Sequence, residues 1–390
     1  MHAIPTELSD IKKNRNSRPD LARASARERI PEANIARGVA MSIVIIGHAV
    51  SIVRHNMVHS ATGEVHGLIE FTYRFLFIPT IPLFVFLTGL ILAHTQIQIK
   101  SPAQFYAFVA KKAQRILVPY FSYSLLVLFP KFILRDFVYH QPDEQISAFL
   151  LSSLQAIFLY PTHNPMGVLW FLHTLFFLYL LAPIFMWMTD RVGGLITLLV
   201  ILSLSFVQEI EILNTEELLN YLFYFHCGYV FHANRRVYVA KLMKLPFLWI
   251  SLSIALMCAS IAFLPDEPDN VLNHIIRTCV RLTSVIGAYT FARVLAEKWN
   301  FIARQLDLFG SHSYDIYLNG HLIQVSLRML TLGLMITHPI LTWFILAFVP
   351  LYVPIPLSRY ILSRNRLSAT LLQGASWTRR PEPMPQSPSA

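Results

Sequence analysis

The sequence has 390 residues, of which 55% are hydrophobic and 14% are charged, and its formal net charge is +10. This composition excludes an ordinary soluble domain and is typical of a protein that crosses a membrane many times. The basic residues lie in the tails and in loops between apolar runs, where topology explains them better than nucleic-acid binding does. The three cysteines form no CxxC pair and show no metal-ligand spacing, so we expect no metal site.

The two ends of the chain differ from its middle. Residues 1–34 are polar and basic and contain no short apolar core before a cleavage site, so we expect no cleaved signal peptide. We predict that residues 1–34 form a disordered cytoplasmic tail, and that residues 365–390, rich in Pro, Ser and Arg, form another. Residues 35–364 are then expected to form an all-α integral membrane domain of about ten transmembrane helices.

Ten apolar runs are long enough to cross a bilayer, which takes roughly 17 to 25 residues each. They are residues 35–54, 71–95, 114–134, 165–188, 192–208, 217–233, 246–264, 273–296, 313–336 and 338–362. Because Lys and Arg accumulate in cytoplasmic loops, the basic loops place both termini inside. The loop orientations assigned from the N-terminus agree with those assigned from the C-terminus only if residues 135–165 stay on the outer side of the membrane. The short apolar run 145–160 is therefore predicted to be interfacial or re-entrant.

The first apolar run carries an arginine and a histidine, Arg37 and His48. On a helix this spacing is three turns plus about 20°, so both residues share one face, about 16 Å apart along the axis. Arg37 is near the cytoplasmic entrance and His48 is near mid-membrane. A buried histidine can simply form an interhelical hydrogen bond. It can also serve as a general base or nucleophile in a channel whose entrance carries a cation.

A second histidine, His321, lies at a comparable depth in the run that starts near Ser313. Tyr314 and Tyr317 precede it by seven and four residues and therefore share its face. The two histidines could meet in one site. For Ser313, an N-cap at the helix start explains the residue at least as well as a role in the site.

Five blocks of this sequence, in order, resemble the membrane-bound acyltransferase 3 family, whose members move acetyl or related acyl groups from coenzyme A to sugars of cell-surface glycans and lipids. The Arg37 and His48 spacing matches the family signature, and "IPLFVFLTGLIL" (81–92), "RILVPY" (115–120), "LWFLHTLFFLYLLAPI" (169–184) and "GSHSYDIYLNGH" (310–321) are similar to its other blocks. Two positions depart from the pattern: Thr80 stands where a relative carries histidine, and His173 where proline is usual.

The resemblance implies an O-acyltransferase of the bacterial cytoplasmic membrane, with acetyl-CoA or another acyl-CoA as co-substrate. Its acceptor would be a sugar hydroxyl of an exopolysaccharide, an O-antigen or a lipid-linked oligosaccharide. Arg37 and Arg115 would then hold coenzyme A phosphates, although plain positive-inside topology also explains Arg115. His48 would deprotonate the acceptor or carry the acyl group. His321, with Tyr317 or Ser313, would orient His48 or stabilise the oxyanion.

Several basic residues fall on the outer side, against the positive-inside rule. Arg277 and Arg281 form an i,i+4 pair with no acidic residue nearby in their own helix, and Arg74 lies at a similar depth. We hypothesise that they bind an anionic acceptor. For Arg74, a structural ion pair with Glu70, four residues earlier, is the alternative explanation. Trp170 lies near the start of the fourth run, on the outer side, where an interfacial aromatic belt or sugar stacking would explain it.

A transporter or flippase of a glycan or lipid-linked precursor would also show ten spans and charged residues inside the membrane. It would move its substrate without consuming acyl-CoA. The sequence lacks the paired Gly- or Pro-broken spans that favour this alternative.

Overall fold

The computed structural model describes residues 30–57, 63–97, 99–138, 146–207, 210–265, 270–336 and 338–376. Within these ranges all regular structure is helical. The helices are α3 (Pro31–Met57), α4 (Gly63–His94), α5 (Pro102–Val138), α6 (Ile146–Phe158), η1 (Pro161–His163), η2 (Gly167–Leu169), α7 (Trp170–Val192), α8 (Gly194–Leu204), η3 (Ile212–Asn214), α9 (Thr215–Ala233), α10 (Arg235–Leu242), α11 (Pro246–Phe263), α12 (Val271–Lys298), α13 (Asn300–Ser311), α14 (Ser313–Gly333), α15 (Pro339–Tyr352), α16 (Pro354–Pro356), η4 (Leu357–Ile361), η5 (Leu362–Arg364) and α17 (Arg366–Gln373).

Seven helical segments in the described part of the chain are long and apolar enough to cross a membrane. They are Pro31–Val53, Gly67–His94, Pro102–Ile133, Gly167–Val192, Pro246–Phe263, Val271–Lys298 and Pro339–Arg364. The chain is therefore a multi-pass membrane protein. These segments coincide with seven of the ten predicted spans; the total of ten, and the cytoplasmic placement of both termini, stay predictions.

The other three predicted spans form helices that are shorter or more polar than these seven segments. α8 has 11 residues and is therefore only about 16 Å long. α9 begins with two glutamates, Glu216 and Glu217. α14 carries polar residues along its length, among them Asp315, Asn319 and His321. Polar residues inside a bundle lower the mean hydropathy of a helix, because its partners there are other helices and not lipid.

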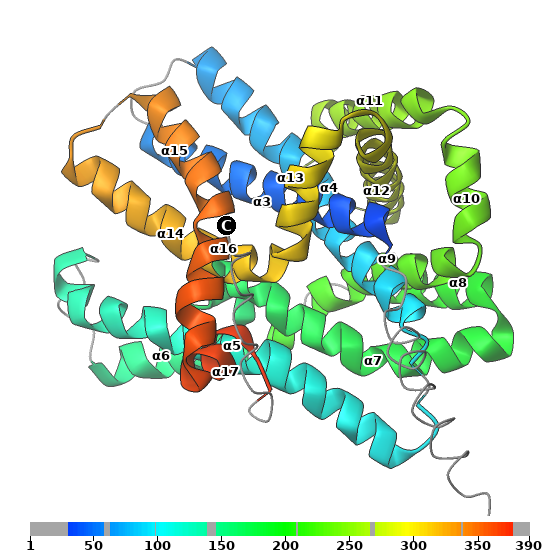
Figure 1. Cartoon of the computed structure of the whole chain (residues 1–390), viewed down its shortest axis with the longest axis horizontal. Helices are drawn as coiled ribbons and strands as arrows, with labels where there is room; N and C mark the ends of the chain where they lie inside the picture. The colour runs from blue at the N-terminus through cyan, green and yellow to red at the C-terminus, as the bar shows by residue number, and fades with distance from the viewer. Residues whose placement is uncertain are drawn as a thin grey trace, which may run out of the picture.

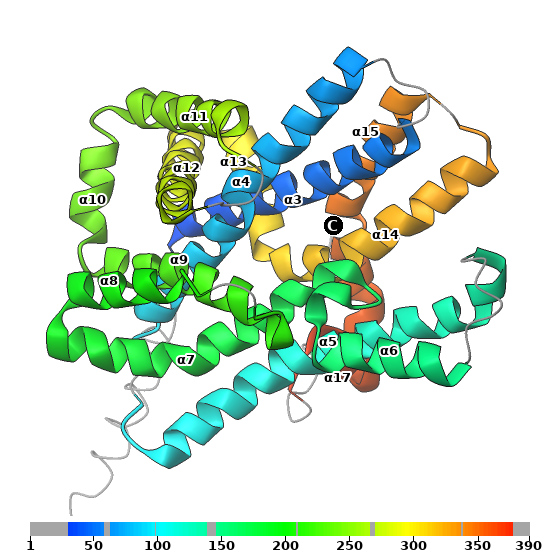
Figure 2. The same cartoon turned by 180° about the vertical axis from the view of Figure 1, so that it is seen from behind.

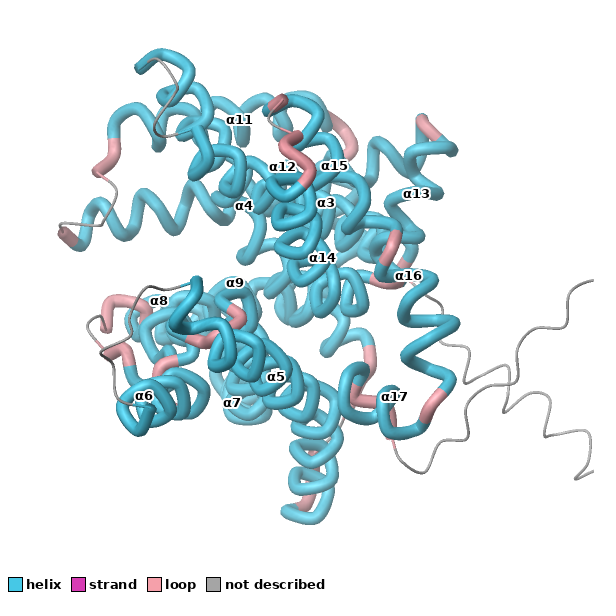
Figure 3. The backbone as a smooth tube through the Cα atoms, turned by 90° about the vertical axis from the view of Figure 1, so that its left-hand side faces the viewer, coloured by secondary structure: helices cyan, strands magenta, loops and turns pink. Residues whose placement is uncertain are grey.

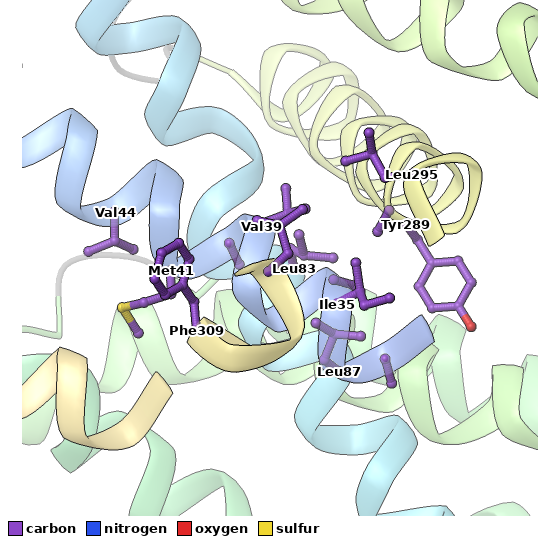
Figure 4. Packing of buried hydrophobic residues seen from close by; sticks show 14 of the residues in the cluster. Ile35, Val39, Met41, Val44, Leu83, Leu87, Tyr289, Leu295 and Phe309 are labelled. Atoms are coloured by element: carbon purple, nitrogen blue, oxygen red, sulfur yellow. The ribbon is translucent and has the colours of Figure 1, made fainter. Parts of the chain in front are cut away.

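The first helix lies at the centre of the bundle. α3 packs against α4, α12, α13, α14 and α15 and is surrounded by them in both face views (Figure 1, Figure 2). Its apolar side chains form a core with residues from three other helices, α4, α12 and α13 (Figure 4): Ile35, Val39, Met41 and Val44 meet Leu83, Leu87, Tyr289, Leu295 and Phe309. From the side, α3, α4 and α11–α15 form one group and α5–α9 with α17 form another (Figure 3).

The two groups are joined where α4 crosses α9. A Cβ atom on Gly89 would lie 1.9 Å from the carbonyl oxygen of Phe225, and one on Gly228 would lie 1.9 Å from that of Phe86. Two glycines facing opposite backbones allow the helices to approach this closely, as small residues do at interfaces between membrane helices. This crossing fixes α9 against α4.

The segment predicted as interfacial or re-entrant contains the 13-residue helix α6, which is shorter than the roughly 20 residues that a span needs. The loop that follows reaches α5: Asn164 Nδ2 donates to the hydroxyl of Tyr120 at 3.1 Å and to that of Ser124 at 2.8 Å. Asn164 Oδ1 accepts from the backbone N–H of Met166 at 2.9 Å. These bonds satisfy the polar groups of a loop that is buried among helices.

Both predicted tail boundaries need correction. α3 begins at Pro31, a residue whose fixed φ suits the first helical position, and not at residue 35. Residues 366–373, assigned above to a disordered tail, form α17, which packs against α5. Its Leu372 packs with the cluster around Ile116 and Tyr120, which explains why a segment of low mean hydropathy is held in place. The rest of the two predicted tails, residues 1–29 and 377–390, lies outside the described residues.

Candidate active site

The two histidines singled out in the sequence lie side by side. The ring centroids of His48, on α3, and His321, on α14, are 5.5 Å apart, with their planes inclined by 59°. The edge of Phe77, on α4, packs against His48 at 5.3 Å and 74°. Phe77 fits there because residue 47 is glycine: a Cβ atom at Gly47 would lie 2.7 Å from the phenyl ring. Three helices therefore fix the position of His48.

α14 is anchored to its neighbours one turn beyond His321. The side-chain amide of Gln324 donates to the carbonyl of Ile45 at 2.8 Å and to that of Leu346 at 3.0 Å. These bonds tie α14 to α3 and α15 and fix the position of the His321 ring relative to the His48 ring. His321 Nδ1 is buried and has no hydrogen-bond partner within the described residues. A buried imidazole nitrogen without a partner is available to a substrate or to a proton.

Both tyrosines that share the face of His321 use their hydroxyls to hold other segments. Tyr317 donates to the carbonyl of Val168, and its ring packs edge-on against Phe171 with centroids 5.8 Å apart. Tyr314 donates to the carbonyl of Arg115. In this structure Tyr317 therefore positions the loop before α7, and its proton is engaged there.

The cytoplasmic end of the predicted channel gathers three cations around one aromatic ring. Arg37 and Arg115, from α3 and α5, interact electrostatically with each other and with Tyr179 of α7. Lys112 adds a third positive charge, with its Nζ atom 3.5 Å from the centroid of the Tyr179 ring. Arg37 is half-buried and Arg115 is exposed. Three neighbouring positive charges repel one another, and an anionic ligand would relieve that repulsion.

A comparison with known families bears directly on these groups. A family model described as an acyltransferase domain, Acyl_transf_3, matches residues 30–359, which include both histidines and all three cations. The chain belongs to the acyltransferase 3 family. No curated protein and no solved structure matches the chain. Together with its spans, this membership makes the protein a membrane acyltransferase.

The acyltransferase has a cavity of about 230 Å³ that contains all three arginines predicted to meet an acceptor. Arg74 comes from α4, and Arg277 and Arg281 come from α12. Phe77 belongs to the same lining, so the cavity adjoins the ring that packs on His48. The structure brings the predicted acceptor residues together, next to the histidine pair.

No pattern in the sequence indicates the carboxylate that faces one of these arginines. Glu217, at the start of α9, interacts with Arg281, as do the hydroxyls of Tyr221 and Tyr224. Arg281 indeed has no acidic partner in its own helix; the partner comes from a different helix. A contact between α9 and α12 leaves no periodic signal in the sequence.

Trp170 lies within the aromatic packing of the acyltransferase. Its ring stacks on Tyr221, which lines the arginine cavity, with centroids 6.1 Å apart and planes at 26°. It also packs edge-on against Phe171. This environment favours a supporting role near the cavity over a lipid-facing aromatic belt.

Ser313 takes neither of the roles expected for it. It is the first residue of α14, and the cap position before it is His312. His312 Nδ1 lies 3.2 Å from a carboxylate oxygen of Asp315 in the first turn. Ser313 precedes His321 by eight residues, about 12 Å along the helix, so it does not join the histidine pair.

Two further residues of the acyltransferase site escaped the sequence analysis. Lys112 lies one turn before Arg115 and shares its face, a spacing that could have indicated it. Phe77 gave no signal, because a phenylalanine in an apolar run is an ordinary core residue.

Proposed function

We propose that this protein is an O-acyltransferase of a bacterial cytoplasmic membrane. It transfers an acetyl or similar acyl group from acyl-CoA to a sugar hydroxyl of an exopolysaccharide, an O-antigen or a lipid-linked oligosaccharide. One observation carries the proposal: the helix with Arg37 in the cation cluster also holds His48 against His321. Family membership supports the reaction class.

The donor would bind at the cation cluster. Arg37, Lys112 and Arg115 would hold the phosphates of coenzyme A, since guanidinium and ammonium groups bind phosphate oxygens through charge-assisted hydrogen bonds. Arg37 and His48 are about 16 Å apart along one helix face. That separation lets a bound acyl-CoA extend its thioester from the cations to the histidines.

Transfer then needs a base and an acid at the same place. His48 takes the proton of the acceptor hydroxyl while the oxygen attacks the thioester carbonyl carbon. The tetrahedral intermediate collapses with cleavage of the C–S bond, and the thiolate of coenzyme A takes the proton from the His48 imidazolium. His321 holds the His48 ring in place and lies beside the imidazolium as it forms and discharges. In a two-step version of the reaction, His48 itself carries the acyl group.

The test uses the full chain in lipid nanodiscs. Release of free thiol from acetyl-CoA is measured with wild-type protein and with His48→Ala, in the presence of a glycan acceptor fraction. The matched control is His163→Ala, because His163 is exposed in η1. Loss of a general base or nucleophile should lower the rate by about 100-fold or more. In parallel, the acylation of surface glycans from cells that express each variant is measured by mass spectrometry. An acyl pattern that survives His48→Ala would overturn the proposal.

A further inference from the structure

The arginine cavity is built at the ends of three membrane helices. Arg74 lies in the fourth turn of α4, Ser260 one turn before the end of α11, and Arg277 in the second turn of α12. α11 and α12 follow one another and are antiparallel, so these ends belong to one face of the protein. The lining also includes Phe77 and Pro82, from the middle of α4, so the cavity extends from near the ends of these helices into the interior of the bundle.

The cavity concentrates guanidinium groups. Arg277 and Arg281 are one helical turn apart on α12, and Arg74 joins them from α4. Arg281 is held by Tyr221, Tyr224 and Glu217. Three planar donor groups from two helices around about 230 Å³ can form several charge-assisted bonds with one multivalent anion.

We infer that this cavity binds a phosphate group of the acceptor, and thereby makes the enzyme specific for sugars attached to phosphate. The inference rests on the proposed function, since it names the class of acceptor for the same site. A carboxylate offers one face of two oxygens to one guanidinium, whereas a phosphate or diphosphate offers several oxygens to several donors. A neutral sugar offers these guanidinium groups only uncharged acceptor oxygens, which form weaker hydrogen bonds than phosphate oxygens do.

The position of the cavity also bears on which sugar is acylated. Phe77 lines the cavity and packs on His48, so one aromatic ring separates the bound phosphate from the reacting histidine. The sugar next to the phosphate is then the one whose hydroxyl reaches His48. A sugar several residues along a polymer would reach the histidine only if its phosphate lay outside the cavity.

The first arm of the test measures binding to the full chain in nanodiscs by calorimetry. The probes are farnesyl diphosphate, farnesoate and farnesol, which share a chain and differ in the head group, together with glucose 1-phosphate as a soluble phosphate. Farnesyl diphosphate should bind more tightly than farnesoate and farnesol. Comparison with glucose 1-phosphate separates a lipid-borne phosphate from a phosphate on a soluble glycan. Equal binding of farnesoate or farnesol would overturn the inference.

The second arm uses Arg277→Gln and Arg281→Gln. Each should weaken farnesyl diphosphate binding by about tenfold or more, because a hydrogen bond to a charged group is lost. Arg281→Lys keeps the positive charge but loses the paired N–H donors of the guanidinium group. Its affinity for farnesyl diphosphate should lie between those of the wild type and Arg281→Gln, and it tests the inference even if Arg281→Gln folds poorly. Arg328→Gln is the control, since Arg328 is half-buried in α14 and is not part of the cavity lining. Unchanged binding in both cavity variants would overturn the inference.

A third arm separates this inference from the proposed function. Thiol release from acetyl-CoA is measured without acceptor and with a farnesyl diphosphate-linked glucosamine and its neutral farnesyl glycoside. If the diphosphate ligand binds but no acceptor or water consumes acetyl-CoA, the proposed function fails and the phosphate cavity stands. If acetyl-CoA is consumed equally with both acceptors, the proposed function stands and the inference fails.

Discussion

His48 and His321 lie with ring centroids 5.5 Å apart, although one comes from α3, the first described helix, and the other from α14, more than 270 residues later in the chain. α3 and α14 hold this distance through the bonds of Gln324 to Ile45 and Leu346. Under the proposed mechanism we expect two imidazoles at this spacing to act as a unit, because a proton or acyl group on one ring changes the environment of the other.

The pairing predicts strongly non-additive losses. His48→Ala and His321→Ala should each reduce thiol release, and the double variant should lose little more than His48→Ala alone. The rates of acetyl-CoA turnover by the wild type, the two single variants and the double variant form a double-mutant cycle, which gives the coupling energy between the two histidines. Multiplicative losses in the double variant would show that the histidines act independently.

Gly47→Ala should damage activity while the fold persists. The added methyl would lie 2.7 Å from the Phe77 ring, so the ring must move away from His48. The cost in stability is about 1–3 kcal/mol for an overpacked site. Turnover should fall with the size-exclusion profile unchanged, while Gly167→Ala, which meets nothing within 4 Å, should keep full activity. Retained turnover in Gly47→Ala would contradict a role for this contact.

Tyr317→Phe separates a positioning role from acid–base catalysis. The variant loses the bond to Val168 but keeps the ring on Phe171. A lost hydrogen bond of about 0.5–1.5 kcal/mol lowers turnover by about tenfold or less. Loss of a general acid would lower it by about 100-fold or more, which would assign chemistry to the hydroxyl. Tyr352→Phe, which removes only an exposed bond to Gln305, is the control.

The C-terminal segment should tune donor binding. Gly374 ends α17 with a φ of 65°, and a Cβ atom there would lie 2.5 Å from the carbonyl oxygen of Arg115. Gln114 fixes the same contact by donating to Ala375 at 3.1 Å. Gly374→Ala should therefore raise the KM for acetyl-CoA several-fold and leave that for the acceptor unchanged. Gly333→Ala, at a glycine with open space around it, is the matched variant. Equal shifts in both KM values would instead indicate general unfolding.

Gly89→Ala tests what holds the two helix groups together. The new Cβ would meet the Phe225 carbonyl at 1.9 Å, a contact that only a shift of α4 relative to α9 can relieve. We expect the midpoint of thermal unfolding in detergent to fall. The loss in unfolding free energy should exceed the about 1–3 kcal/mol that ordinary overpacking of a core costs. Gly167→Ala again serves as the reference. An unchanged midpoint would mean that the crossing contributes little to stability.

Patterns within one helix indicated part of the arrangement of this candidate site. The Arg37 and His48 spacing placed a cation and a histidine on one face, and the family blocks placed His321 near them. The i,i+4 pair Arg277 and Arg281 drew attention to α12 before any cavity was known. These signals are readable because a helix repeats every 3.6 residues and because a charge in an apolar run is rare.

Contacts between helices were less predictable. Nothing in the sequence pairs Glu217 with Arg281, Phe77 with His48, or Tyr317 with Val168, since each pair joins separate segments. Hydropathy alone also does not show which helices are the most apolar, because α9 and α14 carry polar residues along their length. The tail boundary failed because α17 is held by packing on α5, which composition does not record.

The central place of α3 has a consequence for biogenesis. The ribosome makes this helix before the other described helices, yet α12, α13, α14 and α15, which enclose it, are made late. Until they arrive, the nascent chain must keep Arg37 and His48 in the bilayer or at the insertion machinery without their final neighbours. Contacts this distant in sequence form slowly. The His48–His321 pair therefore forms only after α14 has been made, and a chain that terminates before α14 lacks it.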